Sequence, residues 1–224
     1  MPMPSVPIDG ACEALVAGEQ LWFLPQRVAY WPTRRTLLVA DAHLGKAGAF
    51  RRLGVPVPAG TTQDDLRTLS GLIDSLGAER LVFLGDLVHS RTAVEAAAPA
   101  VTAWRRRHAG VHMLLVVGNH DRHAGALPEA WGVESVEEPH VVHSLAFVHA
   151  PRTIPDAFVI GGHVHPGVRL VGRGRQRVRV PCFVLTRAFA VLPAFGAFTG
   201  LQEIQPQEGW RIHAVAGGRV VPLG

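Results

Sequence analysis

The sequence is poor in features that would assign it to several other classes of protein. Only two of the 224 residues are cysteines, and Cys12 and Cys182 both lie in apolar surroundings. Two cysteines placed in this way give neither a disulfide framework nor the ligand spacing of a structural zinc site. We therefore expect buried free thiols in a reducing cytoplasm. The N-terminus also lacks the basic and apolar regions of a signal peptide, which agrees with a cytoplasmic location.

Long apolar runs, repeats and low-complexity tracts are also missing. No apolar stretch approaches the roughly 20 residues that a membrane-spanning helix needs, so we expect no membrane contact. Apolar residues nevertheless make up 48% of the chain, which is ordinary for a globular protein. Because no linker separates one part of the sequence from another, we predict a single domain over residues 1–224.

Positive charge comes almost entirely from arginine. Lys46 is the sole lysine among 22 basic residues, and the formal net charge is +4. The planar guanidinium group suits phosphate, so this composition is a weak indication of an anionic partner. No helix-turn-helix, zinc-finger or comparable signature is present, which argues against a plain DNA-binding protein.

Apolar periodicity predicts an α/β fold. Helical spacing is expected at 61–77 and 93–107, and a loop rich in Gly, Pro and Arg at 41–60. An irregular segment should follow residue 121, after which the pattern becomes all-strand. The expected strands are 14–16, 21–24, 28–31, 36–40, 81–84, 111–117, 141–142, 145–148, 157–160, 168–171, 178–180, 183–185, 188–192 and 212–215. This order favours a mixed sheet packed on a second sheet, with flanking helices.

Five short polar clusters follow the ends of apolar strands. They are Asp41-Ala42-His43, Gly85-Asp86, Gly118-Asn119-His120-Asp121, His149 and Gly162-His163-Val164-His165. The carboxyl ends of strands are where open α/β sheets bind ligands. Carboxylates, an amide and imidazoles without a thiolate suit two divalent cations, with manganese favoured and iron or zinc left open. Each cluster alone is equally well explained as a turn, but all five together predict a dinuclear metal site.

The residue types indicate individual roles. Asp86 can bridge two cations, because its two oxygens can face different metals. Asn119 offers a neutral oxygen ligand. His120 can contact the ester, and Asp121 can hold the orientation of that ring or stabilise its charged form. Extended backbone would send both histidines of the last cluster to the same side, where two close cations can each take one.

In this order, the clusters resemble the calcineurin-like metallophosphoesterases over residues Asp41 to His165. The resemblance implies a four-layer α/β/β/α sandwich with a dinuclear site at the strand ends. Within that superfamily, the segments 40–46, 50–52, 55–61, 85–91, 162–166, 181–185 and 192–200 are similar to the bacterial ligase-associated DNA-damage-response endonucleases. Ala42 stands where that subfamily is expected to have a larger apolar residue.

The resemblance also implies a ligand set and an activity. One cation is expected on Asp41, His43, Asp86 and His165, and the other on Asp86, Asn119, His149 and His163. His120 is expected to stand over the phosphate. The implied activity is a manganese-dependent phosphodiesterase that cuts single-stranded DNA internally in DNA repair, with ligase, helicase or exonuclease partners. A metal-bridging hydroxide is expected to attack phosphorus in line.

Basic and aromatic residues near the clusters are candidates for contacts with nucleic acid. The candidates for substrate binding are Lys46, Arg51, His89 and Arg91. Phe50 and Trp131 are candidates for stacking on unpaired bases. The arginines at 173, 175, 177 and 179 form either a basic strand face or a solvated hairpin.

Two other functions stay open at this stage. The first is a metallophosphoesterase that hydrolyses a nucleotide, a pyrophosphate or a phosphoprotein. The second is a non-catalytic interaction module that kept the fold and lost its metals, although the intact set of ligand residues argues against it.

Overall fold

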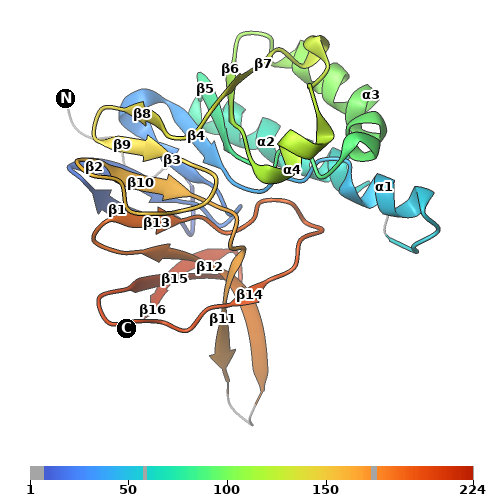
Figure 1. Ribbon diagram of the computed structural model, residues 1–224. Coiled ribbons are helices and arrows are strands. Elements are labelled where there is room, and N and C mark those ends of the chain that lie inside the picture. Colours follow the sequence, from blue (N-terminus) through green and yellow to red (C-terminus); the bar gives the residue numbers. More distant parts are fainter. Residues whose placement is uncertain (1–7, 58–59, 173–175, 224) are drawn as a thin grey trace.

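Two β-sheets face each other in the structure, and the α-helices cover the outer side of one of them (Figure 1). The computed structural model describes residues 8–57, 60–172 and 176–223. The helices are α1 Lys46–Arg52, α2 Thr61–Leu76, α3 Arg91–Arg107 and α4 Asn119–Ala124, with short 3-10 helices η1 Pro32–Arg34 and η2 Glu129–Trp131.

The first sheet has the strand order β1-β2-β3-β4-β5-β6-β7. Its strands are β1 Cys12–Val16, β2 Glu19–Phe23, β3 Ala29–Trp31, β4 Thr36–Val39, β5 Arg80–Leu84, β6 His112–Val116 and β7 Val133–Val136. Strands β1 to β4 form an antiparallel meander, whereas β4 to β7 are parallel. Parallel neighbours need a crossover connection, and α2 and α3 lie in the two connections that follow β4 and β5.

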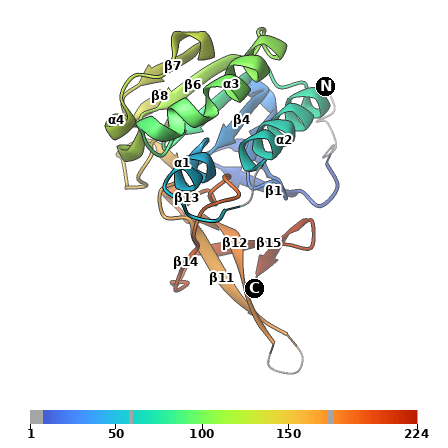
Figure 2. The same ribbon diagram turned by 90° about the vertical axis from the view of Figure 1, so that its right-hand side faces the viewer.

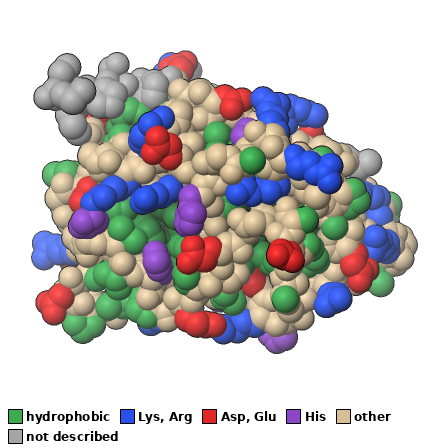
Figure 3. Space-filling view, turned by 90° about the horizontal axis from the view of Figure 1, so that it is seen from above, with side chains coloured by type: hydrophobic (Ala, Val, Ile, Leu, Met, Phe, Trp, Pro, Cys, Tyr) green, Lys and Arg blue, Asp and Glu red, His purple; other side chains and the backbone are tan. Residues whose placement is uncertain are grey.

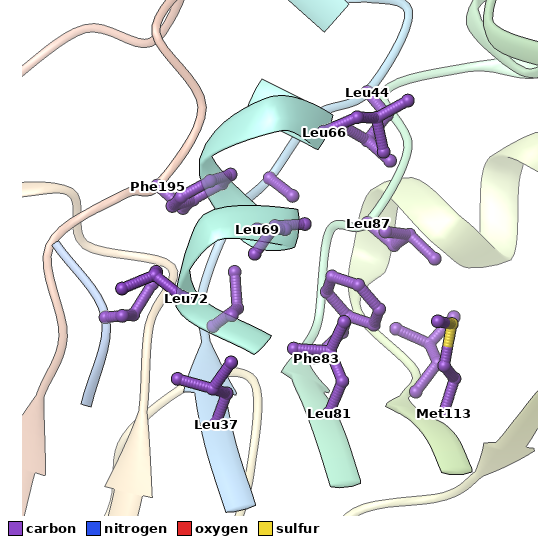
Figure 4. Close-up of a cluster of buried hydrophobic side chains, with 14 of the residues drawn as sticks. Leu37, Leu44, Leu66, Leu69, Leu72, Leu81, Phe83, Leu87, Met113 and Phe195 are labelled. Carbon is purple, nitrogen blue, oxygen red and sulfur yellow. The ribbon is translucent and has the colours of Figure 1, made fainter. Parts of the chain in front are cut away.

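Helix α2 packs its apolar face on this sheet. Leu66 and Leu69 recur at helical spacing, and Gly77, with φ 57°, ends the helix in the left-handed conformation that glycine adopts easily. Leu66 and Leu69 share one buried cluster with Phe83 of β5, and Phe195 joins it from the C-terminal part of the chain (Figure 4). Each fully buried side chain of this size contributes about 1.5–3 kcal/mol to the hydrophobic free energy of folding.

The second sheet has the order β14-β11-β12-β13-β10-β9-β8, with β15 paired to β12 and β16 to β15. Its strands are β8 His140–Val142, β9 Leu145–Phe147, β10 Phe158–Gly161, β11 Pro166–Val171, β12 Arg177–Leu185, β13 Phe189–Val191, β14 Gln202–Glu203, β15 Arg211–Ala216 and β16 Arg219–Leu223. The rings of Phe23 and Phe183 stack between the sheets at 4.3 Å. The hairpin of β11 and β12 projects from the body (Figures 1 and 2).

The predicted class, a mixed α/β fold of two packed sheets with flanking helices, is confirmed. The outer face of the second sheet is covered differently from the first. Within the described ranges no α-helix packs there, and Ile154, Ile204 and Trp210 from irregular segments pack on it instead. On this side, irregular chain therefore takes the place of the helical layer that the resemblance implies.

Several predicted elements need correction. Helix α1 lies within the expected loop at 41–60, because Ala47 and Ala49 are small enough to be buried where α1 contacts α3. The expected irregular segment after residue 121 contains the second half of α4, and also η2 and β7. The strands predicted at 178–180 and 183–185 are one strand, β12. Pro181 does not end it, since pairing passes there from Gly167 of β11 to β15.

Both cysteines are free thiols. Cys182 is buried, and burial raises its pKa to about 12, whereas Cys12 is only half-buried, contrary to expectation.

No helix in the described part of the chain is long and apolar enough to cross a bilayer. Arginine side chains are spread among acidic and apolar ones on the face seen in Figure 3. The net positive charge therefore does not by itself locate an anion site on that face.

A buried carboxylate on α2 makes a prediction about stability. Asp65 is 8% exposed. Burial raises its pKa from 3.8 to about 7, although Arg27 and the amide of Ala197 oppose the rise. A carboxyl group with a raised folded-state pKa stabilises the fold below its unfolded pKa, and this stability is lost as pH rises through the folded pKa. We therefore expect Asp65 to destabilise the protein progressively between about pH 4 and pH 7.

The substitution Asp65→Asn isolates this effect from the histidines that titrate in the same range. Between pH 5 and pH 8, the free energy of unfolding of D65N should gain about 2–3 kcal/mol relative to wild type, measured by urea denaturation. The control is Asp74→Asn, an exposed carboxylate on the same helix. A difference between D65N and wild type that stays constant across this range would contradict the prediction.

Candidate metal centre

The five polar clusters meet at one edge of the sandwich, where parallel strands of both sheets end. The clusters follow β4, β5 and β6 in the first sheet and β9 and β10 in the second. Their side chains form two groups, Asp41 with His43 and His165, and Asp86 with His149 and His163, each with all its ligand atoms within 4.8 Å of one another.

The first group contains a buried carboxylate oxygen that lacks a hydrogen-bond donor among the described residues. Asp41 is fully buried, and its Oδ1 accepts no hydrogen bond from any residue that the structure describes. The Nε2 atom of His165 lies 3.6 Å from that oxygen. Burial, reinforced by the charge of Lys46, lowers the pKa of His43 to about 2, so its imidazole is neutral and offers a lone pair. A buried charge normally needs a partner, and a divalent cation between these atoms fits that need.

The second group is arranged around the imidazole of His149. Its Nδ1 donates to the carbonyl oxygen of Leu84 at 3.2 Å, so Nε2 presents a lone pair. That Nε2 lies 2.8 Å from Oδ1 of Asn119, 2.9 Å from Nδ1 of His163 and 3.5 Å from Oδ1 of Asp86. Lone pairs that converge in this way suit a cation, and a neutral oxygen with imidazoles and a carboxylate is a ligand set for a divalent metal.

Asp86 lies between the two groups, with one oxygen toward each. Its Oδ1 is 3.5 Å from Nε2 of His149, and its Oδ2 is 3.9 Å from Nε2 of His43. Two glycines leave the room for the carboxylates. A Cβ atom at Gly118 would lie 2.4 Å from Oδ1 of Asp86, and one at Gly162 would lie 2.4 Å from Oδ2 of Asp41. This placement fits a carboxylate shared by two cations.

Backbone strain is concentrated at these residues. Asp41, His43, Asp86, His163 and His165 all have φ between 45° and 66°. A non-glycine residue in this region costs of order 1 kcal/mol, and such strain gathers at functional sites. The expectation of extended backbone at the last cluster is therefore wrong. His163 and His165 occupy a bend, which directs the two rings into different groups.

His120 stands beside both groups without belonging to either. Its amide donates to Oδ1 of Asp86 at 2.9 Å, and its Nδ1 lies 3.1 Å from the carbonyl oxygen of His89. Its Nε2 faces Oδ2 of Asp86 at 3.9 Å, and its side chain is 35% exposed. The ring is thus held from one side and accessible from the other.

The structure corrects the role expected of Asp121. Its two carboxylate oxygens accept from the amides of Val88, at 3.1 Å, and Gly118, at 3.0 Å. Burial raises its pKa, and these hydrogen bonds oppose the rise. Because these oxygens bind backbone amides, the carbonyl of His89 holds the His120 ring instead. Asp121 ties together the loops that follow β5 and β6.

The four candidates for substrate binding lie on one flank of the centre, on α1 and around the start of α3. Lys46 begins α1 and is half-buried. Burial lowers the pKa of its ammonium group, while the charges of Asp86 and Asp41 oppose that shift. Arg51 is exposed on the last turn of α1, and Arg91 is exposed at the first residue of α3.

The candidates for base stacking and the arginines at 177 and 179 differ in how exposed they are. Phe50 is half-buried on the same flank. Trp131 has no exposed surface, so it cannot stack on a base. Residues 173 and 175 lie outside the described ranges, whereas Arg177 and Arg179 are exposed on the same face of β12.

Sequence reasoning missed one support of the centre. The carboxylate of Glu138 accepts from the amide of His149 at 2.6 Å and pairs with Arg152 at 2.7 Å. Glu138 precedes β8 in a segment with no motif, and 11 residues separate it from its partner. No pattern in the sequence could have indicated that contact.

Comparisons with known proteins were made on sequence and on structure. No protein-family model and no curated protein sequence matches the chain. The structure is similar to that of the Pseudomonas putida nuclease MPE, with 41% identity and a TM-score of 0.83, over 95% of this chain and 100% of that one. A phosphoesterase from E. coli, Yfce, matches at 16% identity over 84% of this chain and 97% of that one, but its TM-score of 0.41 supports no argument.

Proposed function

The chain belongs to the metallophosphoesterase family, and on that premise we propose that it is a metal-dependent nuclease that cuts single-stranded DNA internally. The observation that carries the proposal is the pair of ligand groups that share Asp86. Such pairs of metals act on phosphate esters. The similarity to a nuclease over nearly the whole chain favours a phosphodiester of nucleic acid over a phosphoprotein or a pyrophosphate.

Manganese is the proposed cofactor. One cation would be held by Asp41, His43, Asp86 and His165, and the other by Asp86, Asn119, His149 and His163. Oxygen and imidazole ligands without a thiolate suit Mn²⁺, and also iron or zinc. Bound here, the cations would lower the pKa of a water molecule and neutralise charge on the phosphate.

The side chains around the centre perform the rest of the proposed reaction. A water molecule gives up a proton to solvent, its oxygen forms a bond to phosphorus, the ester bond to the leaving sugar oxygen breaks, and that sugar oxygen takes a proton. His120, with both ring nitrogens protonated, is placed to donate it from Nε2, because the carbonyl of His89 accepts the hydrogen bond from Nδ1. Lys46, Arg51 and Arg91 flank the site and are proposed to bind backbone phosphates.

The cellular setting follows from the same resemblance. We propose a cytoplasmic role in DNA repair, alongside ligase, helicase or exonuclease partners. The proposal rests on the similarity to the DNA-damage-response endonucleases and is independent of the geometry of the centre.

One assay tests the proposed function. Circular single-stranded DNA incubated with the protein and Mn²⁺ should become linear and then fragment, because a circle yields only to internal cuts. The same reaction with EDTA should leave the circle intact, and a duplex circle should be cut more slowly. Parallel reactions with Mg²⁺, Fe²⁺ and Zn²⁺ identify the preferred metal. An intact circle, together with rapid hydrolysis of nucleotides or pyrophosphate, would overturn this proposal. The protein would then be a metallophosphoesterase that acts on one of those smaller substrates.

A further inference from the structure

A row of aromatic rings leads from the metal centre to the flank formed by α1 and the start of α3. The ring of His89 lies 4.4 Å from that of His120, between centroids. The ring of Phe50 stacks with that of His89 at 6.1 Å between centroids and 27° between the planes, and Phe198 meets the edge of Phe50 at 5.8 Å. The row therefore begins at the imidazole that lies beside both ligand groups.

A cavity opens beside these rings. It has a volume of about 260 Å³ and is lined by Ala49, Phe50, Leu53, His89, Ser90 and Thr92. Apolar side chains around it are unusually exposed, with Leu53 at 76%, Val55 at 41% and Phe198 at 37%. Exposed apolar groups gathered at one place indicate a binding surface. Helix α1 borders the cavity and lies beside α3 (Figure 2).

The charges around the cavity select the kind of ligand. Arg51 and Arg52 are exposed on the last turn of α1, and Arg91 is exposed at the first residue of α3. Arg52 and Arg91 both approach Glu95, at 3.3 Å and 4.0 Å, so part of their charge is already balanced. An apolar cavity whose lining residues are adjacent in sequence to exposed arginines, here called the base slot, matches one aromatic base flanked by backbone phosphates.

We propose that this cavity binds one unpaired nucleobase of the substrate strand, next to the phosphodiester at the metal centre, by stacking against Phe50. This inference rests on the proposed function, since it concerns the strand whose phosphate the metals hold. A base paired within a duplex would not reach the slot, so stacking there selects single-stranded substrate. Phe198, from the loop between β13 and β14, contacts the edge of Phe50.

The test removes the base and the ring separately and then together. The substrate is a single-stranded oligonucleotide with one phosphodiester among phosphorothioate linkages, which keep the negative charge of the backbone and slow cleavage elsewhere. Two further oligonucleotides carry an abasic residue on one or the other side of that bond. Wild type should cut one abasic substrate about 5- to 100-fold more slowly, the range given by the loss of one base–aromatic stack. The other abasic substrate should be cut at nearly the normal rate.

The variant Phe50→Leu keeps the apolar volume and removes the ring. It should cut the intact oligonucleotide more slowly by a similar factor, with no further loss on the sensitive abasic substrate. Phe50→Trp should restore the rate. The matched control is Phe189→Leu, a half-buried phenylalanine on β13 in the second sheet. Manganese content, measured for each variant, shows whether the centre itself has changed.

The outcomes separate this inference from the proposed function. If wild type fails to cut the intact oligonucleotide, the proposed function fails and the base slot fails with it. If wild type cuts that substrate and neither abasic position nor F50L changes the rate, the function stands and the slot is wrong. Equal losses for F50L on intact and abasic substrates also overturn the slot, because the ring then acts without the base.

Discussion

The substitution Asp86→Asn is expected to remove almost all activity and to reduce bound manganese from two ions to at most one. The amide can still accept the backbone N–H of His120, which reaches Oδ1 at 2.9 Å. It cannot present a negative oxygen to each of the two ligand groups. In wild type, Oδ1 of Asp86 lies 3.5 Å from Nε2 of His149, and Oδ2 lies 3.9 Å from Nε2 of His43. Each ligand group therefore loses negative charge, and the rate should fall by about 10³-fold or more, as expected when charge stabilisation of the transition state is lost.

Metal analysis and stability separate this effect from misfolding. After dialysis against Mn²⁺, metal content is measured by mass spectrometry, and thermal unfolding is followed with and without the ion. Manganese should raise the Tm of wild type, because a ligand that binds only the folded state stabilises it. D86N should gain much less, while its metal-free Tm stays at or above that of wild type, since a buried charge has been removed.

The control for this experiment is Asp74→Asn, which changes an exposed carboxylate that pairs with Arg107 on the protein surface. D74N should keep full metal content and full activity. Two tightly bound manganese ions in D86N would show that Asp86 is not shared between them. The assignment of the centre would then have to change.

The sequence carries enough information to bring together the residues of the candidate metal centre, and the reason is topological. Carboxyl ends of parallel strands converge at one edge, so a polar cluster after each apolar strand predicts a shared site. The structure brings Asp41, Asp86 and His149 together from segments that are far apart in the sequence. This prediction required no knowledge of long-range contacts, because the shared edge of the parallel strands brings these residues close together.

Other features of the centre depend on contacts that no local pattern encodes. Asp121 is adjacent to His120 in sequence, which favours a direct interaction between them, but its oxygens bind two backbone amides. The left-handed conformations of His163 and His165 are imposed by the tertiary fold against local preference. Their division between the two groups is therefore invisible in the sequence, where alternation suggests extended chain.

The errors in secondary structure have the same origin. Glycine and arginine around Ala47 and Ala49 suggest a loop, yet contact with α3 stabilises a short helix there. Pro181 suggests the end of a strand, because proline lacks the N–H that a ladder needs. In β12 this residue lies where one pairing partner gives way to another, so the strand continues through it. Local rules fail where a neighbouring element decides the conformation.

The second large effect is expected from His120→Ala, and its size should depend on the leaving group. Loss of a general acid costs about 10²- to 10⁴-fold, and we expect this loss on DNA, whose leaving sugar oxygen needs a proton. In a nitrophenyl diester, the nitrophenolate leaving group departs without protonation. H120A should therefore cut this diester nearly as fast as wild type does. Manganese content should be unchanged, because His120 belongs to neither ligand group.

The alternative is that His120 only binds or positions the phosphate. Equal losses on DNA and on the nitrophenyl diester would then be observed, and the role of proton donor would be excluded. His112→Ala is the matched control, because this exposed histidine lies at the other end of β6 and pairs with Glu134. The carbonyl of His89 lies 3.1 Å from Nδ1 of His120 and directs Nε2 toward the open side of the centre. A loss that depends on the leaving group would therefore identify Nε2 as the atom that gives up the proton.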